Sequence, residues 1–129
     1  MGACYSVTLK VCLKDEEGAI RALNEHIAKD TGVDYSLGKY VTIGATPDTF
    51  DGLMKILLAE GQHKVTIYQH DKFRIYDNDF GASYGWERVM MEWFNVLAPF
   101  LEDRSLLLIY PDEDYDKLVI KNGKCVQVH

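Results

Sequence analysis

Apolar and polar side chains alternate from residue 5 to residue 13, with the apolar ones at the odd positions. A period of two is typical of a β-strand that buries one face in an antiparallel sheet. An acidic segment, residues 15–17, then leads into a predicted helix that ends near Gly32, where glycine permits a left-handed cap. The chain is therefore expected to begin with a strand followed by a helix.

Two later segments repeat their apolar side chains at helical spacing, and the residues around them indicate where each helix starts or stops. In the first, Thr46 is predicted to cap the helix, Pro47 to occupy its first position and Gly61 to end it. The second covers residues 86–101, and Pro99 is expected to distort its last turn. Both segments are predicted to pack their apolar stripes against the sheet.

Short apolar runs between turn residues predict the remaining strands, at residues 39–43, 64–68, 72–77, 105–110, 117–121 and 124–128. Asn122-Gly123 separates the last two, and this dipeptide favours the type I′ turn of a β-hairpin. The order of elements predicts a single α+β domain over residues 1–129, a variant of the ferredoxin-like fold. Its antiparallel or mixed sheet is expected to have about five to seven strands, with three helices packed on one face.

The composition is that of a folded chain, because 47% of the 129 residues are hydrophobic. No apolar run approaches the roughly 18 residues that a membrane span requires, and no secretory signal is evident, so we expect a cytoplasmic protein without a membrane partner. The three cysteines and four histidines follow no metal-binding or redox spacing. We therefore expect neither a metal nor a cofactor.

The formal net charge of −6 argues against direct binding of nucleic acid, because acidic side chains repel its phosphates. Six acids lie between residues 101 and 116, where Arg104 is the only base. A localised acidic surface with a nearby tyrosine suits contact with a basic surface on another protein. The predicted partner-binding residues are Glu102, Asp103, Asp112, Glu113, Asp114, Tyr115 and Asp116.

These features predict a small, non-enzymatic protein-binding module. If its partner handles nucleic acid, the acidic face would compete with phosphate charge, as in an inhibitor or a phage-type anti-defence protein. No nucleophile, base and orienting group share a local spacing, so no catalytic residue is predicted and enzymatic activity is the less favoured alternative. A homodimer joined through the edge of the strand at 124–128 is a further alternative.

Residues 77–87, DNDFGASYGWE, supply the other function class, a small-molecule-binding protein or a minor enzyme. Glycines before a helix can let a ligand approach the backbone, but the aspartates of this predicted loop oppose an anion. Ser83 is instead expected to cap the helix by accepting a hydrogen bond from the Trp86 amide. A ligand site here would use Asp77, Asp79, Ser83 and Tyr84. A concave pocket at this place would favour ligand binding, and a convex acidic surface would favour protein binding.

Overall fold

The computed structural model describes residues 2–29, 47–59, 65–83, 85–110 and 116–128. Within these residues six strands form one sheet: β1 (Gly2–Val11), β2 (Thr66–His70), β3 (Phe73–Ser83), β4 (Leu106–Tyr110), β5 (Asp116–Lys121) and β6 (Lys124–Val128). The helices are α1 (Glu16–Lys29), α3 (Phe50–Ala59), α4 (Trp86–Leu97) and the 3-10 helix η1 (Ala98–Phe100). The predicted α+β architecture is confirmed, and the predicted strand at residues 39–43 lies outside the described residues.

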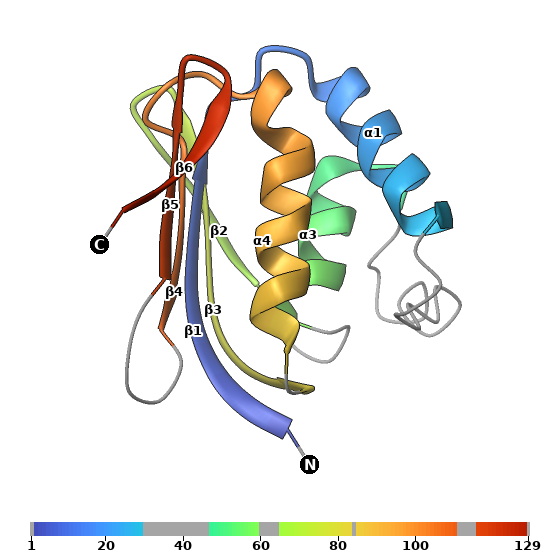
Figure 1. Cartoon of the computed structure of the whole chain (residues 1–129), viewed down its shortest axis with the longest axis vertical. Helices are drawn as coiled ribbons and strands as arrows, with labels where there is room; N and C mark the ends of the chain where they lie inside the picture. The colour runs from blue at the N-terminus through green and yellow to red at the C-terminus, as the bar shows by residue number, and fades with distance from the viewer. Residues whose placement is uncertain (1, 30–46, 60–64, 84, 111–115, 129) are drawn as a thin grey trace.

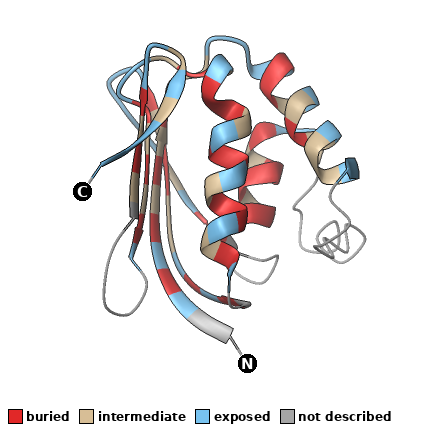
Figure 2. Ribbon diagram, viewed as in Figure 1, coloured by how far each residue is buried: buried red, intermediate tan, exposed pale blue. Residues whose placement is uncertain are grey.

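The strands lie in the order β2-β3-β1-β4-β5-β6, and every neighbouring pair is antiparallel. Figure 1 shows α1, α3 and α4 on the same side of this sheet. Buried residues gather where these helices meet the strands, as Figure 2 shows. In the described ranges no helix combines the length and the apolar character needed to cross a membrane.

β1 is a central strand whose pairing organises the sheet. β3 pairs with it from Gly2↔Ser83 to Val11↔Arg74, and β4 pairs with its other edge. Its alternate side chains enter the core with at most 3% of their surface exposed, and these are Tyr5, Val7, Leu9 and Val11. The predicted alternation is confirmed, although the strand runs from Gly2 to Val11 instead of over residues 5–13.

The predicted loop at residues 77–87 was wrong for most of its length, because β3 continues through Ser83. β1 supplies hydrogen-bonding partners along this whole segment, so sheet pairing prevails over the weak strand propensity of aspartate and glycine. Gly85, with φ of 87°, is the N-cap residue of α4, which has no side-chain cap hydrogen bond. The structure therefore places Gly85, and not Ser83, at the N-cap position.

The start of α3 also differs from the prediction. The helix begins at Phe50, and Thr49 Oγ1 accepts a hydrogen bond from the Gly52 amide at 2.9 Å. Thr49 is thus the capping residue, and Pro47 precedes the helix instead of opening it. The predicted cap, Thr46, lies outside the described residues.

Two other local predictions are confirmed. Asn122 and Gly123 both have positive φ, 54° and 73°, as a type I′ turn between β5 and β6 requires. Pro99 lies in η1, where α4 gives way to a 3-10 turn because proline lacks the amide that would continue the α-helix.

Tyr5 connects the sheet to α4 and supplies a testable pH dependence. Its hydroxyl donates a hydrogen bond to Glu87 Oε2 at 2.6 Å, and burial together with this bond raises the pKa of Tyr5 to about 12. The phenol of the unfolded chain ionises near pH 10, so the unfolded state loses its proton first as pH rises. The stabilisation by Tyr5, about 2 kcal/mol, is therefore complete below about pH 10 and is lost between there and about pH 12.

Urea unfolding of the native protein and of Tyr5→Phe, at about pH 8 and about pH 11, measures this contribution. We expect the Phe variant to be less stable by about 2 kcal/mol at the lower pH and by clearly less at the higher pH. A difference between the two proteins that is the same at both pH values would contradict the assigned role of the Tyr5 proton.

Candidate functional site on the outer face of the sheet

The face of the sheet turned away from the helices, here called the outer face, contains two long rows of paired residues. The strand registers define a first row of Thr66, Asp77, Thr8, Leu108, Lys117 and Val128. The second row consists of Tyr68, Ile75, Lys10, Leu106, Val119 and Val126. Each row crosses the six described strands, because residues directly opposite one another in antiparallel strands share a face.

Large apolar side chains reach solvent on this outer face. The exposed fractions are 46% for Tyr68, 48% for Tyr110, 43% for Val126 and 39% for Val128. Tyr110 pairs with Ser6, which places it on the same face as the two rows. In the described part of the chain the exposed large hydrophobic residues thus all lie on one face of the sheet.

A polar hollow of about 420 Å³ lies beside these side chains, and its lining includes Ser6, Thr8, Thr66, Asp77 and Asp79. Ser6 Oγ donates a hydrogen bond to Asp79 Oδ1 at 2.5 Å, and the Tyr68 hydroxyl donates to Asp77 Oδ2 at 2.9 Å. Two of the predicted ligand-binding residues, Asp77 and Asp79, therefore do share a concave surface. They reach it from a strand and not from a loop.

Asp77 has one carboxylate oxygen without a donor. Its Oδ1 is buried and has no hydrogen-bond partner within the described residues. The bond that Oδ2 accepts raises the pKa of Tyr68, because a phenolate would lose this bond and would face the carboxylate. Since a buried acceptor without a donor is unfavourable, a donor from beyond the described residues would be stabilising at Asp77.

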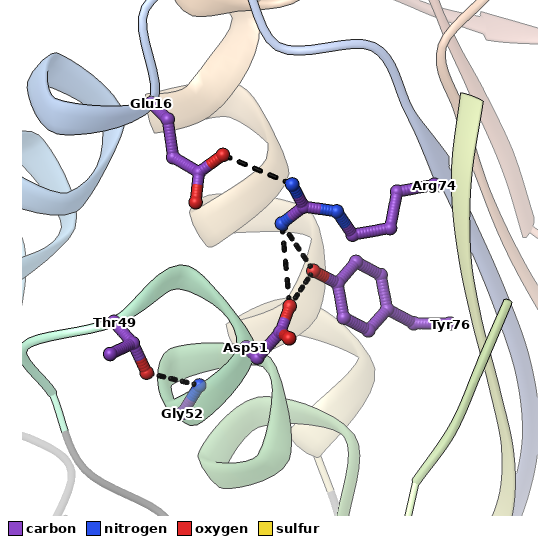
Figure 3. A network of polar contacts seen from close by, with 6 residues as sticks. All are labelled: Glu16, Thr49, Asp51, Gly52, Arg74 and Tyr76. Atoms are coloured by element: carbon purple, nitrogen blue, oxygen red, sulfur yellow. Dashed lines mark hydrogen bonds and ion pairs between the residues drawn. The ribbon is translucent and has the colours of Figure 1, made fainter. Parts of the chain in front are cut away.

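A second polar cluster lies on the inner face, where the sheet meets the first turns of α1 and α3 (Figure 3). The Tyr76 hydroxyl donates to Asp51 Oδ1 at 2.5 Å. Arg74 Nη1 donates to the Tyr76 hydroxyl at 3.2 Å and to Asp51 Oδ1 at 3.3 Å, and Nη2 donates to Glu16 Oε1 at 3.1 Å. Arg74 of β3 thereby links both helices to the sheet.

The protonation of this inner cluster suits a structural role. Burial raises the pKa of Tyr76, and the hydrogen bond that it donates to Asp51 adds to the effect. Burial lowers the pKa of Arg74, but its bonds to Tyr76 and Glu16 outweigh burial, so the net change is upward. Tyr76 therefore stays a neutral donor and Arg74 a cation at neutral pH, and neither can exchange a proton with a substrate there.

A larger hollow of about 510 Å³ adjoins the inner cluster, and Thr49, Tyr68 and Gln69 contribute to its lining. The strongest polar groups of this lining, the guanidinium and the two carboxylates, are already bound to one another. A ligand would have to replace these contacts. The arrangement is therefore better suited to holding α1 and α3 against β3 than to binding a charged ligand.

Two of the predicted partner-binding acids make contacts within the chain. Glu102 accepts a hydrogen bond from Cys12 Sγ at 2.5 Å and pairs with Lys72 at 3.6 Å, and these contacts lower the pKa of Glu102. Asp103 Oδ1 accepts the amide of Asn122 at 2.8 Å and so supports the turn between β5 and β6. Both residues thus contribute to local structure.

The remaining predicted residues are placed only in part. Asp116 begins β5 six residues before Asn122, about 20 Å along the strand from Asp103, so the structure does not bring these two acids together. Ser83 ends β3. Outside the described residues lie Asp112, Glu113, Asp114, Tyr115 and Tyr84. The acidic face therefore stays a prediction.

The described residues contain no group of three or more His, Cys, Asp or Glu side chains placed to hold a metal ion. Burial raises the pKa of the Cys12 and Cys125 thiols, and the bond to Glu102 raises that of Cys12 further. A raised pKa reduces the fraction of thiolate, which is the nucleophilic form of cysteine. These two thiols are therefore poorly suited to nucleophilic chemistry.

The inner cluster was not predicted from the sequence, because the apolar residues of β3 do not mark the side chains that face the helices. The apolar residues at the start of this strand are Phe73 and Ile75, yet the register places Arg74 opposite Val11 and Tyr76 opposite Leu9 on the inner face. Phe73 is buried on the outer face, where the Lys10 ammonium lies 4.3 Å from its ring centroid. A cationic side chain can cover an apolar ring in this way, and such cover is invisible in the alternation of the sequence.

The contact between Tyr76 and Asp51 predicts a measurable stabilisation. Tyr76→Phe should lower the free energy of unfolding by about 1–2 kcal/mol, because the hydrogen bond from the buried Tyr76 to a half-exposed carboxylate is lost. Tyr68→Phe is the matched control: it also removes a hydroxyl bonded to an aspartate, but at an exposed position, and should cost about 0.5 kcal/mol or less. Equal losses in urea unfolding, or additive effects of Tyr76→Phe and Asp51→Asn, would contradict this assignment.

Comparisons with known proteins identify no relative of this chain. No protein-family model, no curated protein and no solved structure was found to match it.

Proposed function

We propose that the protein is a non-enzymatic protein-binding module whose binding surface is the outer face of the sheet. The supporting observation is the gathering of the exposed large apolar side chains of the described residues, Tyr68, Tyr110, Val126 and Val128, on this one face. Solvent contact of such a patch is unfavourable, and burial against another protein would remove it.

The mixture of groups on the outer face also suits a protein partner. Tyrosine is enriched in protein interfaces because it combines a large apolar ring with a polar end. Charged residues flank the apolar side chains, with Asp77 and Asp79 on β3 and Lys117 on β5. Apolar groups beside separated charges of both signs can give affinity and also fix the orientation of a partner.

We further infer a ferredoxin-like core with its helices packed on one face. Support comes from the order β2-β3-β1-β4 and from the position of the helices, with α1 and α3 between β1 and β2 and α4 between β3 and β4. The β5–β6 hairpin extends this core at the edge beside β4. This arrangement leaves the outer face available to a partner.

The expected partner with a basic surface, and the role of inhibitor or anti-defence protein, stay predictions. The net charge of −6 favours such a partner over nucleic acid itself. On the outer face, Asp77 and Asp79 offer carboxylates to a basic group, and Asp77 Oδ1 has no donor among the described residues. This acidic part of the surface lies on β3.

A small polar ligand at the hollow of Asp77 and Asp79 is the second candidate function. Its supporting observation is the concave shape, with hydroxyl and carboxylate groups from β1, β2 and β3 in the lining. The ligand class that fits is a hydrogen-bond donor, neutral or cationic, because the aspartates repel anions. A ligand seated there should lose affinity in Asp79→Asn and keep it in Glu92→Gln, an acid of α4 on the helical side of the sheet.

Capture of a partner from an extract of the native host tests the main proposal. Val126→Glu places a charge in the apolar patch and should abolish capture, because a partner would have to bury that charge without compensation. Asn95→Glu is the matched control, since it adds the same charge at an exposed position of α4. This control variant should capture the partner as the native protein does.

A third variant separates the outer face from the predicted acidic turn. It carries Asp112→Asn, Glu113→Gln, Asp114→Asn and Asp116→Asn. The proposal requires that this variant still captures the partner while Val126→Glu does not. The reverse pattern would assign binding to the acidic turn and would overturn the outer-face proposal.

A further inference from the structure

We propose that the outer face binds a second copy of this chain, related to the first by a twofold axis parallel to the strands. The inference rests on the proposed function, because it takes the outer face to be a protein-binding surface. It is carried by the distribution of acids, bases and apolar groups across the two rows of paired residues.

The position of the axis follows from the strand order. β1 and β4 lie at the middle of the six described strands, so an axis between them exchanges β1 with β4, β3 with β5 and β2 with β6. Rotation about an axis parallel to the strands does not shift a row along the strand direction. A residue at one end of a row therefore faces the residue at the other end of the same row in the second copy.

In the first row this operation brings opposite charges together. Asp77 of β3 and Lys117 of β5 occupy the same row through Thr8 and Leu108. One strand lies between the axis and each of these residues. Asp77 of one copy therefore faces Lys117 of the other, and symmetry forms this pair twice. Lys117 would approach Asp77, the residue that lacks a donor for one carboxylate oxygen among the described residues.

In the second row the same operation brings apolar groups together. Ile75 faces Val119 of the second copy, and Tyr68 faces Val126. Tyr68 and Val126 are two of the exposed large apolar side chains, so their contact would bury area that is now in water. The third pair of this row sets Lys10 against Leu106. The Lys10 ammonium lies over its own Phe73 ring, so the alkyl stem of Lys10, and not its charge, would meet Leu106.

The other twofold axis in the plane between the sheets, perpendicular to the strands, is disfavoured by charge. It would place β3 against β3, bringing Asp77 and Asp79 of one copy near the same residues of the other. It would also bring the two Lys117 side chains near each other. Like charges at an interface are costly.

Sedimentation velocity across the micromolar range, at low and high salt, tests the dimer. The native protein should dimerise, and Lys117→Glu should raise the dissociation constant about tenfold or more, because it turns two attractive pairs into repulsive ones. Asp77→Lys should have a similar effect. The double variant Asp77→Lys with Lys117→Glu should restore the native dissociation constant to within about threefold.

A second pair of substitutions keeps the test valid if the Asp77 variant does not fold. Circular dichroism melts monitor folding in every variant. Val126→Glu should also disrupt the dimer, and adding Tyr68→Lys should restore it, because these two positions face each other across the axis. Asn95→Glu is the control and should dimerise as the native protein does. A dimer that Lys117→Glu and Val126→Glu leave unchanged, such as one joined through the β6 edge, overturns the inference.

The outcomes separate this inference from the proposed function. A native protein that stays monomeric across the concentration range overturns the dimer. If Val126→Glu then still abolishes capture of a different host protein, the outer face remains a binding surface and only the second-copy inference fails. If the protein is monomeric and Val126→Glu changes no capture, both proposals fail.

Discussion

The pairing of β1 with β3 along its whole length determines where each candidate site lies. Ten consecutive residue pairs fix the register, and a slip of one residue would turn every buried side chain of β1 to the opposite face. Leu9, buried in the core, therefore fixes Tyr76 beside it on the inner face. On the outer face the same register fixes Asp79 beside Ser6 and Asp77 beside Thr8. The positions of the polar groups on β1 and β3 follow from this one ladder.

The inner face satisfies its polar groups within the chain. Arg74, Tyr76 and Asp51 bind one another, and Tyr5 binds Glu87, so the helices are fixed to the sheet by contacts that also neutralise the buried groups. Such a network favours one arrangement of helices on the sheet, because a half-satisfied network would be less stable than none. Structural use of these residues explains their perturbed pKa values without catalysis.

Elements with a strong local signal could be predicted from the sequence, whereas long-range pairing could not. The alternation of β1, the Asn122-Gly123 turn and the break at Pro99 depend on neighbours in the chain, and each is confirmed. The end of β3 depends on β1, some 70 residues away in sequence, and was missed. Asp77 and Asp79 were chosen as ligand residues for a loop. In the structure they do lie together on a concave surface, but strand pairing and not a loop brings them there.

Unlike the inner cluster, the outer face has an unpaired polar atom and exposed large apolar side chains among the described residues. A small ligand in the hollow would give donors to Asp77 and Asp79, but it would leave Val126 and Val128 exposed at the other side of the sheet, on β6. A partner as wide as the sheet would meet both requirements at once. Hydrophobic burial increases with the area covered, and the charges of Asp77 and Lys117 within the first row can fix the orientation of that partner. This combination favours a protein over a small molecule as the occupant of the outer face.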